Sequence, residues 1–279
     1  MHRKMYWGDF VFSRFIYLFC IVVAIITGFP LLFLVFNSFK SLPEYMQNIW
    51  FIPKTVYFGN YLMVFAPAFL RYFINSLIVS VFGVSLTILV ASLMSYIFAR
   101  FDIKAAKPLY LLVIAGMMIP IHTTLIPVYT LSNAIGVYDH LIGLIGPYIS
   151  FNIPISVFIM TQFFKECPKE LEEAAMIDGG SRFLIYRSII MPLSVPAIST
   201  VGVYTFLNMW NEFIYALVLI DTPEHKTLSL GVRDFYGFQT INIPAVLTAI
   251  LVGSLPVLIF YFVAQDKVIN GLTQGAVKG

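Results

Sequence analysis

The chain has 279 residues, of which 59% are hydrophobic and only 11% are charged. An average soluble domain has roughly 25% charged residues, so this composition indicates a protein embedded in a lipid bilayer. The net charge of +3 is small and the basic residues are dispersed, which excludes a nucleic-acid partner of the usual kind. No segment between the apolar stretches is long enough for a separate soluble domain, which typically needs about 50 residues.

Six apolar stretches are long enough to cross a bilayer as helices, because such a helix needs about 20 residues. We predict transmembrane helices at 15–36, 72–99, 108–131, 141–164, 197–219 and 244–264, within a membrane domain of residues 15–264. Pro120, Pro154 and Pro256 lie near the middle of three of them, and each is expected to bend its helix because proline removes a backbone hydrogen bond. The predicted fold class is therefore an all-α membrane protein with six transmembrane helices.

The basic residues predict how the six helices are oriented. With six spans, both chain ends lie on the same side of the membrane. That side carries Arg3, Lys4, Arg14, Arg100, Lys104, Lys107, Lys165, Lys169, Arg182, Arg187, Lys267 and Lys278, whereas the other side carries only Lys40, Lys54, Arg71, Lys226 and Arg233. Because cytoplasmic loops are enriched in Lys and Arg, the N-terminal segment 1–14, the loop 165–196 and the C-terminal tail 265–279 are predicted to be cytoplasmic.

The loop 165–196, between the fourth and fifth spans, has the pattern of a helix, a glycine turn and a second helix. Gly179 and Gly180 follow the first helix as its C-terminal stop. Ser181 can cap the second helix, and Pro192 is expected to end it. Acidic residues near the start of the first helix are Glu170, Glu172 and Glu173, and one helical face contains Leu171, Ala174, Ala175 and Asp178. Spacing alone leaves open whether this loop docks a partner or is a solvated connector.

Three ordered motifs carry a resemblance to a known family. The loop contains Glu173-Ala174-Ala175, then Asp178-Gly179, then Ile189 and Pro192; the fifth span contains Trp210-Asn211-Glu212-Phe213; and the chain ends in a glycine-rich tail from Gly271 to Gly279. Phe58 to Tyr61 and Asn75-Ser76 extend the match over almost the whole chain. In these motifs and in its span number, the sequence resembles the permease subunits of binding-protein-dependent ABC importers, in particular the smaller six-span maltose-type permease of the carbohydrate-uptake branch.

The resemblance implies a transport subunit with no catalysis of its own, in the cytoplasmic membrane of a bacterium or archaeon. It implies that the loop docks as a coupling helix onto a cytoplasmic ATPase through Glu170, Glu173, Ala174, Ala175, Asp178, Gly179, Ile189 and Pro192, and that the tail reaches the ATPase pair through Gln274, Gly275 and Lys278. Gly180 stands where such permeases often have alanine, and we expect it only to loosen the turn.

The same resemblance names the partners and cofactors. They are a second, homologous permease, two ATPase subunits, an external sugar-binding protein and membrane lipid. ATP and magnesium would be bound by the ATPase, and no cofactor or metal is expected in this chain. The residues agree, because no Gly-x-x-x-x-Gly-Lys-Ser/Thr phosphate-binding loop occurs in the sequence.

Polar residues within the spans are candidates for the solute pathway, because they are costly in lipid and usually face the interior of the bundle. In the fifth span Tyr204, Asn208, Asn211 and Glu212 recur on one side of the predicted helix, and Asn152 lies in the fourth span. Two alternatives stay open. Glu212 either faces the pathway or forms a structural hydrogen bond, and Asn152 either faces the pathway or bonds a carbonyl freed by Pro154.

Two other classes of protein are compatible with six spans. A secondary transporter driven by an ion gradient would need acid or histidine relays, but Glu212 is the only acid within the spans and His122 stands alone. An intramembrane hydrolase would need a nucleophile motif, and no Gly-x-Ser-x-Gly occurs. The sequence therefore favours an ATP-driven importer permease for a sugar, with an oligosaccharide as the expected solute.

Overall fold

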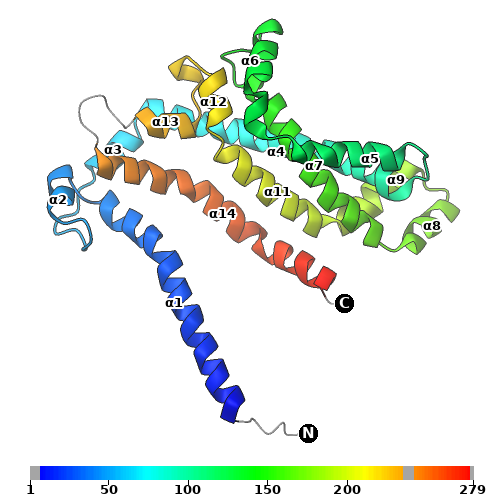
Figure 1. Ribbon diagram of the computed structural model, residues 1–279, viewed down its shortest axis with the longest axis horizontal. Helices are drawn as coiled ribbons and strands as arrows, with labels where there is room; N and C mark the ends of the chain where they lie inside the picture. The colour runs from blue at the N-terminus through cyan, green and yellow to red at the C-terminus, as the bar shows by residue number, and fades with distance from the viewer. Residues whose placement is uncertain (1–6, 235–241, 277–279) are drawn as a thin grey trace. The chain divides into compact units, whose positions relative to one another are not determined.

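The computed structural model describes residues 7–234 and 242–276, and all regular secondary structure within them is helical (Figure 1). Within these described residues, four continuous helices are long and apolar enough to cross a membrane: α1 (Trp7–Ser38), α4 (Pro67–Arg100), α7 (Ile142–Glu166) and α14 (Ile243–Ala276). Two further apolar helix pairs are sharply bent, and counting each pair as one span gives six. The prediction of an all-helical membrane protein is confirmed.

The helices divide into two compact units. The first unit contains Met1–Ala66 and Asp234–Ser254, and the second contains Pro67–Arg233 and Leu255–Gly279, so that α14 contributes to both. In the first unit, the short helices α2 (Leu42–Gln47) and α3 (Gly59–Val64) follow α1. The Asn60 amide donates hydrogen bonds of 2.8 Å to the backbone carbonyls of Ser38 and Lys40. Asn60 of the Phe58 to Tyr61 motif therefore satisfies one carbonyl at the end of α1, at Ser38, and one in the turn that follows it, at Lys40.

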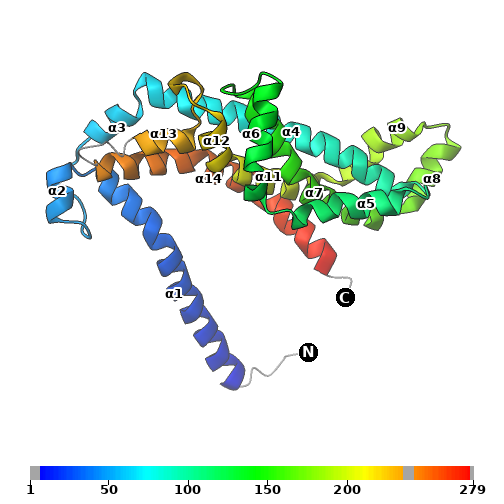
Figure 2. The ribbon, with the colours of Figure 1, turned by 45° about the horizontal axis from the view of Figure 1, so that its top comes forward.

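The core of the second unit consists of α4, α7 and α11 (Val195–Trp210), which lie side by side in both ribbon views (Figures 1 and 2). A stripe of small buried residues runs along α4 and contains Ser76, Ser80, Gly83, Thr87, Ala91 and Ser95. Small side chains allow helix backbones to approach closely, which drives helix packing in a membrane. The Ser95 hydroxyl reaches across and donates a 3.2 Å hydrogen bond to the carbonyl of Val157 on α7.

The third apolar stretch is broken rather than gently bent. It forms α5 (Ala106–Ala115) and α6 (Leu125–Ala134), joined by short 3-10 turns at Gly116–Met118 and Ile121–Thr124. The segments Ala106–Met118 and Ile121–Ala134 meet at 94°. Pro120 lies at the break, where it has no N–H to continue the helix. The bend predicted from this proline is confirmed, and it is sharper than a kink within one helix.

The fifth apolar stretch does not form one continuous helix over 197–219, so that part of the sequence prediction is wrong. Helix α11 ends at Trp210, and a separate short helix, α12 (Ile214–Leu219), follows the irregular residues 211–213. The physical reason is the Glu212 carboxylate, which accepts hydrogen bonds from the backbone N–H groups of Tyr215 (2.8 Å) and Ala216 (3.1 Å). These groups would otherwise bond the preceding helical turn, so the side chain starts a new helix.

The segment after α12 contains a short 3-10 turn, Pro223–His225, and helix α13 (Leu228–Asp234). The Asn75-Ser76 motif of α4 holds this segment. The Asn75 amide donates 2.9 Å hydrogen bonds to the carbonyls of Glu224 and Lys226, and the Ser76 hydroxyl accepts the N–H of Leu228 at 2.8 Å. These side chains therefore fix a connection more than a hundred residues later in the chain.

A second connection joins the loop before α7 to the loop after α12. The Asp139 carboxylate accepts hydrogen bonds from the backbone N–H groups of Asp221 (2.8 Å) and Thr222 (3.0 Å), and its own N–H donates to the carbonyl of Leu219. Burial of Asp139 by itself raises the pKa of its carboxyl group, but the hydrogen bonds from Asp221 and Thr222 outweigh burial and hold that pKa below its usual range. The ionised carboxylate therefore stabilises this loop pair.

Acid is expected to weaken the loop pair, and Asp139→Asn should remove this pH dependence. An aspartate with a lowered folded-state pKa stabilises the fold above its unfolded pKa of about 3.9, and that contribution is lost as pH falls through the folded-state pKa. Asparagine keeps an acceptor oxygen and tolerates the positive φ of 57°, but it does not titrate. The thermal unfolding temperature of the wild type should therefore fall more steeply in acid than that of the variant. Parallel pH profiles would contradict this role.

Candidate functional site

A cavity of about 340 Å³ lies inside the second unit, between α7, α11 and the broken third stretch. Its lining residues are Gly116, Met117, Ile119, Ile121, Tyr148, Phe151, Asn152, Tyr204, Asn208, Met209, Glu212 and Tyr215. Amide, phenol and aromatic groups thus share one wall with aliphatic side chains. Cavities of this kind bind small molecules by combining apolar surface with a few placed polar groups.

A chain of hydrogen bonds connects the polar lining residues. The Asn208 amide approaches the side-chain oxygen of Asn152 at 3.4 Å, and the Asn152 amide donates to the carbonyl of Tyr148 at 2.8 Å. The Tyr148 hydroxyl then donates to Glu212 Oε2 at 2.7 Å. Asn152 therefore does not bond the carbonyl of Ser150, the one that Pro154 leaves without its helical donor. Of the two alternatives open for Asn152, the geometry favours the cavity.

The Glu212 carboxylate accepts three hydrogen bonds. Oε1 accepts the N–H of Tyr215, and Oε2 accepts both the hydroxyl of Tyr148 and the N–H of Ala216. Its backbone carbonyl accepts a further 2.7 Å hydrogen bond from the Ser229 hydroxyl. These contacts support the structural alternative for Glu212, although one side of the residue also lines the cavity.

The structure brings together four of the five predicted pathway residues: Asn152, Tyr204, Asn208 and Glu212. The exception is Asn211, which is exposed and donates to the carbonyl of Leu207 at the end of α11. Asn211 is the C-cap residue of α11, and the hydrogen bond to Leu207 holds its side chain against the end of the helix instead of in the cavity lining. Sequence analysis missed Tyr148 and Tyr215. Tyr148 lies one turn before Asn152 on the same face of α7, and this spacing could have identified it.

The loop 165–196 forms a second candidate site, and its first helix is α8 (Lys169–Ile177). Gly179 has a φ of +83°, and its N–H bonds the carbonyl of Met176 at 3.1 Å, while the N–H of Gly180 bonds the carbonyl of Ala175 at 2.8 Å. This pair of bonds is the Schellman helix ending, which favours glycine in the left-handed position. The glycine stop predicted at this position is present.

Gly180 does more than loosen the turn, contrary to the sequence expectation. A Cβ atom at this position would lie 2.7 Å from the carbonyl oxygen of Ala175, the acceptor of the Gly180 N–H. That distance is shorter than any normal Cβ contact, and the carbonyl oxygen is a backbone atom, which cannot turn away as the end of a flexible side chain could. In this chain, Gly180 allows the turn to close tightly.

The second half of the loop begins as predicted but ends differently. The Ser181 hydroxyl accepts the N–H of Leu184 at 3.2 Å and caps α9 (Arg182–Ile185). A π-helical turn, Tyr186–Ile190, and a short helix, α10 (Met191–Leu193), follow. Pro192 therefore does not end the helical run, which continues to Leu193 and bends by 74° before α11. Proline lacks an N–H and its ring clashes with the carbonyl four residues earlier, so the preceding turn widens.

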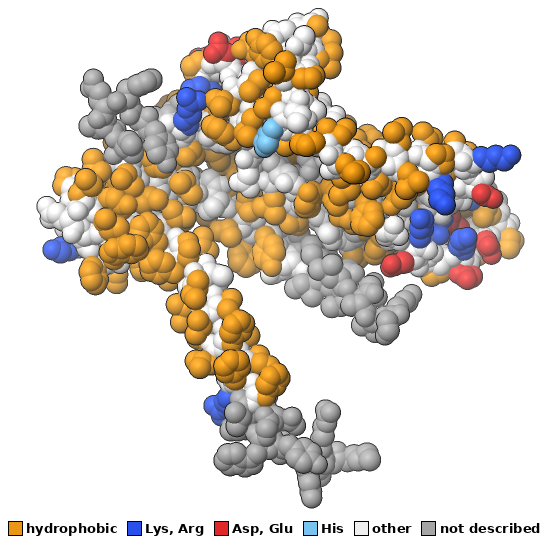
Figure 3. Space-filling view, viewed as in Figure 1, with side chains coloured by type: hydrophobic (Ala, Val, Ile, Leu, Met, Phe, Trp, Pro, Cys, Tyr) orange, Lys and Arg blue, Asp and Glu red, His pale blue; other side chains and the backbone are white. Residues whose placement is uncertain are grey.

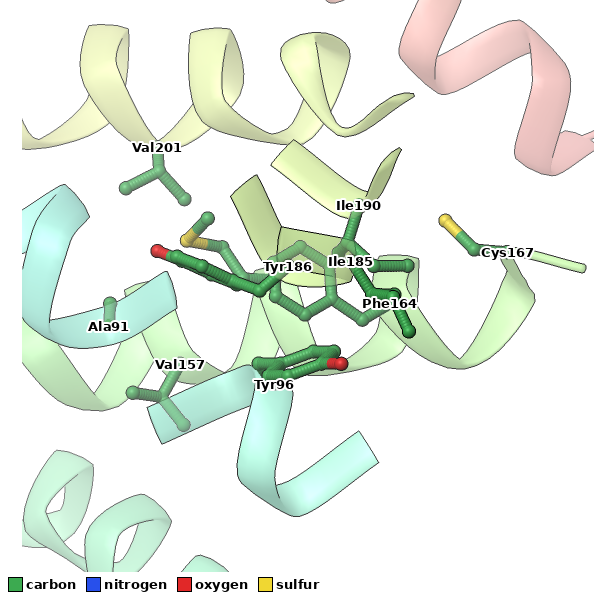
Figure 4. Close-up of a cluster of buried hydrophobic side chains, with 10 residues drawn as sticks. Ala91, Tyr96, Val157, Phe164, Cys167, Ile185, Tyr186, Ile190 and Val201 are labelled. Atoms are coloured by element: carbon green, nitrogen blue, oxygen red, sulfur yellow. The ribbon is translucent and has the colours of Figure 1, made fainter. Parts of the chain in front are cut away.

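A buried hydrophobic cluster fixes this loop to the core helices (Figure 4). It contains Ala91, Tyr96, Val157, Met160, Phe164, Cys167, Ile185, Tyr186, Ile190 and Val201. The residues come from α4, α7, the loop and α11, and the Tyr186 hydroxyl bonds the Ser92 hydroxyl of α4 at 2.7 Å. The loop is therefore packed against the membrane helices rather than loosely attached to them.

The predicted coupling residues divide between the inner and outer faces of the loop. Ala175 and Ile189 are half-buried and pack against the cluster, so they do not belong to an exposed face. Six are exposed: Glu170, Glu173, Ala174, Asp178, Gly179 and Pro192. Large apolar side chains accompany them, with Ile177 86% and Phe183 65% exposed. Figure 3 shows charged side chains gathered at the end of the second unit that carries α8 and α9.

An ion pair beneath α8 also escaped the sequence analysis. The side chains of Arg100, at the end of α4, and Glu172, on α8, are 3% and 4% exposed and form a salt bridge. Their separation in the sequence leaves no local pattern that would pair them.

The predicted tail contacts lie at the limit of the described chain. Helix α14 continues to Ala276, so the backbone of Gln274 and Gly275 is helical, and Lys278 lies outside the described residues.

Within residues 7–234 and 242–276, no group of three His, Cys, Asp or Glu side chains is arranged to hold a metal ion.

A bundle of apolar helices with a polar cavity at a broken helix, and a packed loop that presents an exposed face, defines a membrane transport protein. Similar proteins identify its kind. Residues 83–269 match the family of the binding-protein-dependent transport system inner membrane component. The ORF2 protein of Caldicellulosiruptor sp. (strain Rt8B.4), whose name describes an ABC transporter permease, is 44% identical over 96% of this chain and 98% of its own length.

The arabinooligosaccharides transport system permease AraQ of Bacillus subtilis (strain 168) is 30% identical, with 94% of each chain covered. The crystal structure of a bacterial ABC transporter involved in the import of the acidic polysaccharide alginate contains a chain of the same fold, with a TM-score of 0.83 and 20% identity over 95% of this chain and 99% of that one. The chain belongs to the binding-protein-dependent ABC transporter permease family. It is the membrane component of such a system, not its ATPase.

Proposed function

We propose that this chain is one of two homologous permeases that form the pathway of a carbohydrate importer, with an oligosaccharide as solute. The observation that carries the proposal is the cavity wall, where Asn152, Asn208 and Tyr204 offer hydrogen-bonding groups beside aromatic surface. Sugars present hydroxyl groups and apolar faces together, and such a wall matches both. The name of the AraQ relative, which refers to arabinooligosaccharides, agrees with this solute class.

The proposed orientation places both chain ends and the loop 165–196 in the cytoplasm of a bacterial or archaeal cell. There the exposed face of α8 and α9 would dock onto an ATPase subunit, which binds ATP and magnesium, and a binding protein would deliver the solute from outside. The support is the excess of Lys and Arg on the side of the loop and the apolar side chains exposed on it. Gln274, Gly275 and Lys278 are proposed as additional ATPase contacts.

The experiment that tests the solute class begins with the cognate binding protein. Calorimetric titration with a panel of neutral and acidic oligosaccharides identifies its ligand, and uptake of that ligand is then measured in vesicles containing the complete transporter. Uptake should require ATP and all subunits. A binding protein that holds no carbohydrate, or uptake that continues without ATP, would contradict the proposal.

Asn208→Leu is expected to reduce solute transport while leaving assembly of the complex unchanged. Loss of one hydrogen bond to a sugar costs on the order of 1 kcal/mol, which is about a fivefold loss of apparent affinity. The matched control is Asn211→Leu, because Asn211 lies one turn further along the chain, is exposed and does not line the cavity. Uptake kinetics in vesicles with equal amounts of complex provide the measurement. If the two substitutions reduced uptake equally, Asn208 would have a structural role and no direct contact with the solute.

A further inference from the structure

The core helices of the second unit differ in how they are connected to the loop. Helix α7 runs directly into the loop through Cys167, and α11 directly follows it after Ser194. Helix α4 has no such covalent connection, although it packs against both. Any displacement of α8 can reach α4 only through side-chain contacts, and α4 carries the stripe of small residues against which the other helices pack.

The strongest of these contacts is the buried ion pair between Arg100 and Glu172. Arg100 occupies the last turn of α4 and Glu172 the first turn of α8, so each charge also has the favourable sign for the dipole of its own helix. The Arg100 Nη2 group donates a 2.7 Å hydrogen bond to the carbonyl of Cys167, at the junction between α7 and α8. One guanidinium therefore holds the end of α4, the end of α7 and the start of α8 together.

The pair is sensitive to the loss of either partner. Both side chains are more than nine-tenths buried, and the Nη1 group of Arg100 has no hydrogen-bond partner among the residues that the structure describes. Removal of Glu172 would leave a buried guanidinium with only one neutral acceptor. Breaking a buried pair in this way is far more disruptive than losing an exposed one.

Two weaker contacts lie on the same face of α4. The Tyr96 hydroxyl donates to the carbonyl of Arg182 at 3.3 Å, and the Ser92 hydroxyl bonds that of Tyr186. They hold α9 and the π-helical turn but do not touch α8. Ala175 and Met176 of α8 pack against the buried cluster, to which α4 contributes Ala91 and Tyr96. The polar attachment of α8 to α4 therefore depends on Arg100.

We propose that Arg100 and Glu172 are positioning residues for energy coupling, which tie α8 to α4 so that a displacement of α8 by the ATPase moves the helices around the cavity. The inference rests on the proposed function, because it takes α8 as the ATPase contact. Without the tie, α8 can move while α4 stays in place. ATP is then hydrolysed with less solute transported.

The chain contains its own reporter of this attachment. Cys167 is buried next to the pair, and burial raises the pKa of its thiol, so it should react slowly with a maleimide. The other cysteine, Cys20, is exposed and can be replaced by serine. In the full chain carrying Cys20→Ser, purified in detergent, Glu172→Gln and Arg100→Gln should raise the rate of Cys167 modification by about tenfold. Glu170→Gln, at an exposed position on the same helix, should leave the rate unchanged.

The double variant Arg100→Gln with Glu172→Gln tests whether the two residues act as a pair. Because neither charge is left alone, its modification rate should be no higher than that of either single variant. In the complete transporter, the single variants should raise the number of ATP molecules consumed per solute at least about threefold at equal abundance.

Unchanged Cys167 modification in both single variants would overturn the proposal. So would faster modification with an unchanged ratio of ATP to solute, because α8 would then be loosened without any effect on coupling. A wild-type complex that transports no carbohydrate would instead contradict the proposed function, and the modification rates, measured on the full chain alone, would still decide whether the pair holds α8.

Discussion

Gly179→Val should leave the membrane helices inserted while abolishing most ATP-driven uptake. Gly179 has a φ of +83°, and the left-handed conformation costs an ordinary residue about 1–2 kcal/mol, with a β-branched side chain at the upper end. No atom lies within 4 Å of the Cβ position, so the strain comes from the backbone and not from a steric clash. The chain should relieve it by opening the Schellman turn, which redirects α8.

Asparagine is the matched control at this position, because it adopts the left-handed conformation more readily than other non-glycine residues. Gly179→Asn should therefore retain most uptake, whereas Gly179→Val should lose about tenfold or more. Co-purification of the ATPase with the permease pair and uptake in vesicles provide the two measurements. Full uptake and full ATPase binding in the valine variant would show that the direction of α8 is irrelevant to coupling.

Ala174→Trp tests the exposed face of α8 without straining the backbone. Ala174 is exposed, so the larger side chain should not disturb the core but should keep a docked partner at a distance. We expect the ATPase to dissociate during purification. Glu166→Trp, at the exposed last residue of α7, is the control and should retain the ATPase. Equal retention in both variants would remove this face of α8 from the contact.

Much of the fold follows from the sequence because lipid imposes a simple rule. Backbone groups in a bilayer must bond within the segment, so long apolar runs become helices, as α1, α4, α7 and α14 do. The glycine stop after α8 could also be predicted, since Gly179 is the residue type that the left-handed position favours. Both conclusions depend on local composition alone.

The break in the fifth stretch and the ion pair beneath α8 could not be predicted, because they depend on side chains that meet only after folding. Glu212 ends one helix run and starts another by bonding the N–H groups of Tyr215 and Ala216. In a hydropathy profile, Glu212 is only one polar residue in an apolar stretch, so the profile does not indicate that a helix ends there. Arg100 and Glu172 likewise look like ordinary cytoplasmic charges until α4 and α8 come together.

Glu212→Leu should destabilise the fold, and this result would decide between the two alternatives that the sequence leaves open for Glu212. The substitution removes the acceptor for the hydroxyl of Tyr148 and for the N–H groups of Tyr215 and Ala216. Each hydrogen bond to a charged acceptor contributes about 1.5–3 kcal/mol, so the combined loss of the three should be about 4–5 kcal/mol or more. The start of α12 and its packing against the cavity wall should be lost.

Tyr148→Phe removes only one of the three donors and should therefore cost about 1–3 kcal/mol. Because the two side chains share one hydrogen bond, the double variant should be less destabilised than the sum of the single variants. Glu224→Gln, at an exposed position after α12, is the control. Thermal unfolding of the purified chain gives the stability, and uptake at equal abundance gives the function. Normal stability with impaired uptake in Glu212→Leu would show that the carboxylate serves the solute, because a residue that only starts a helix cannot be removed without loosening that helix.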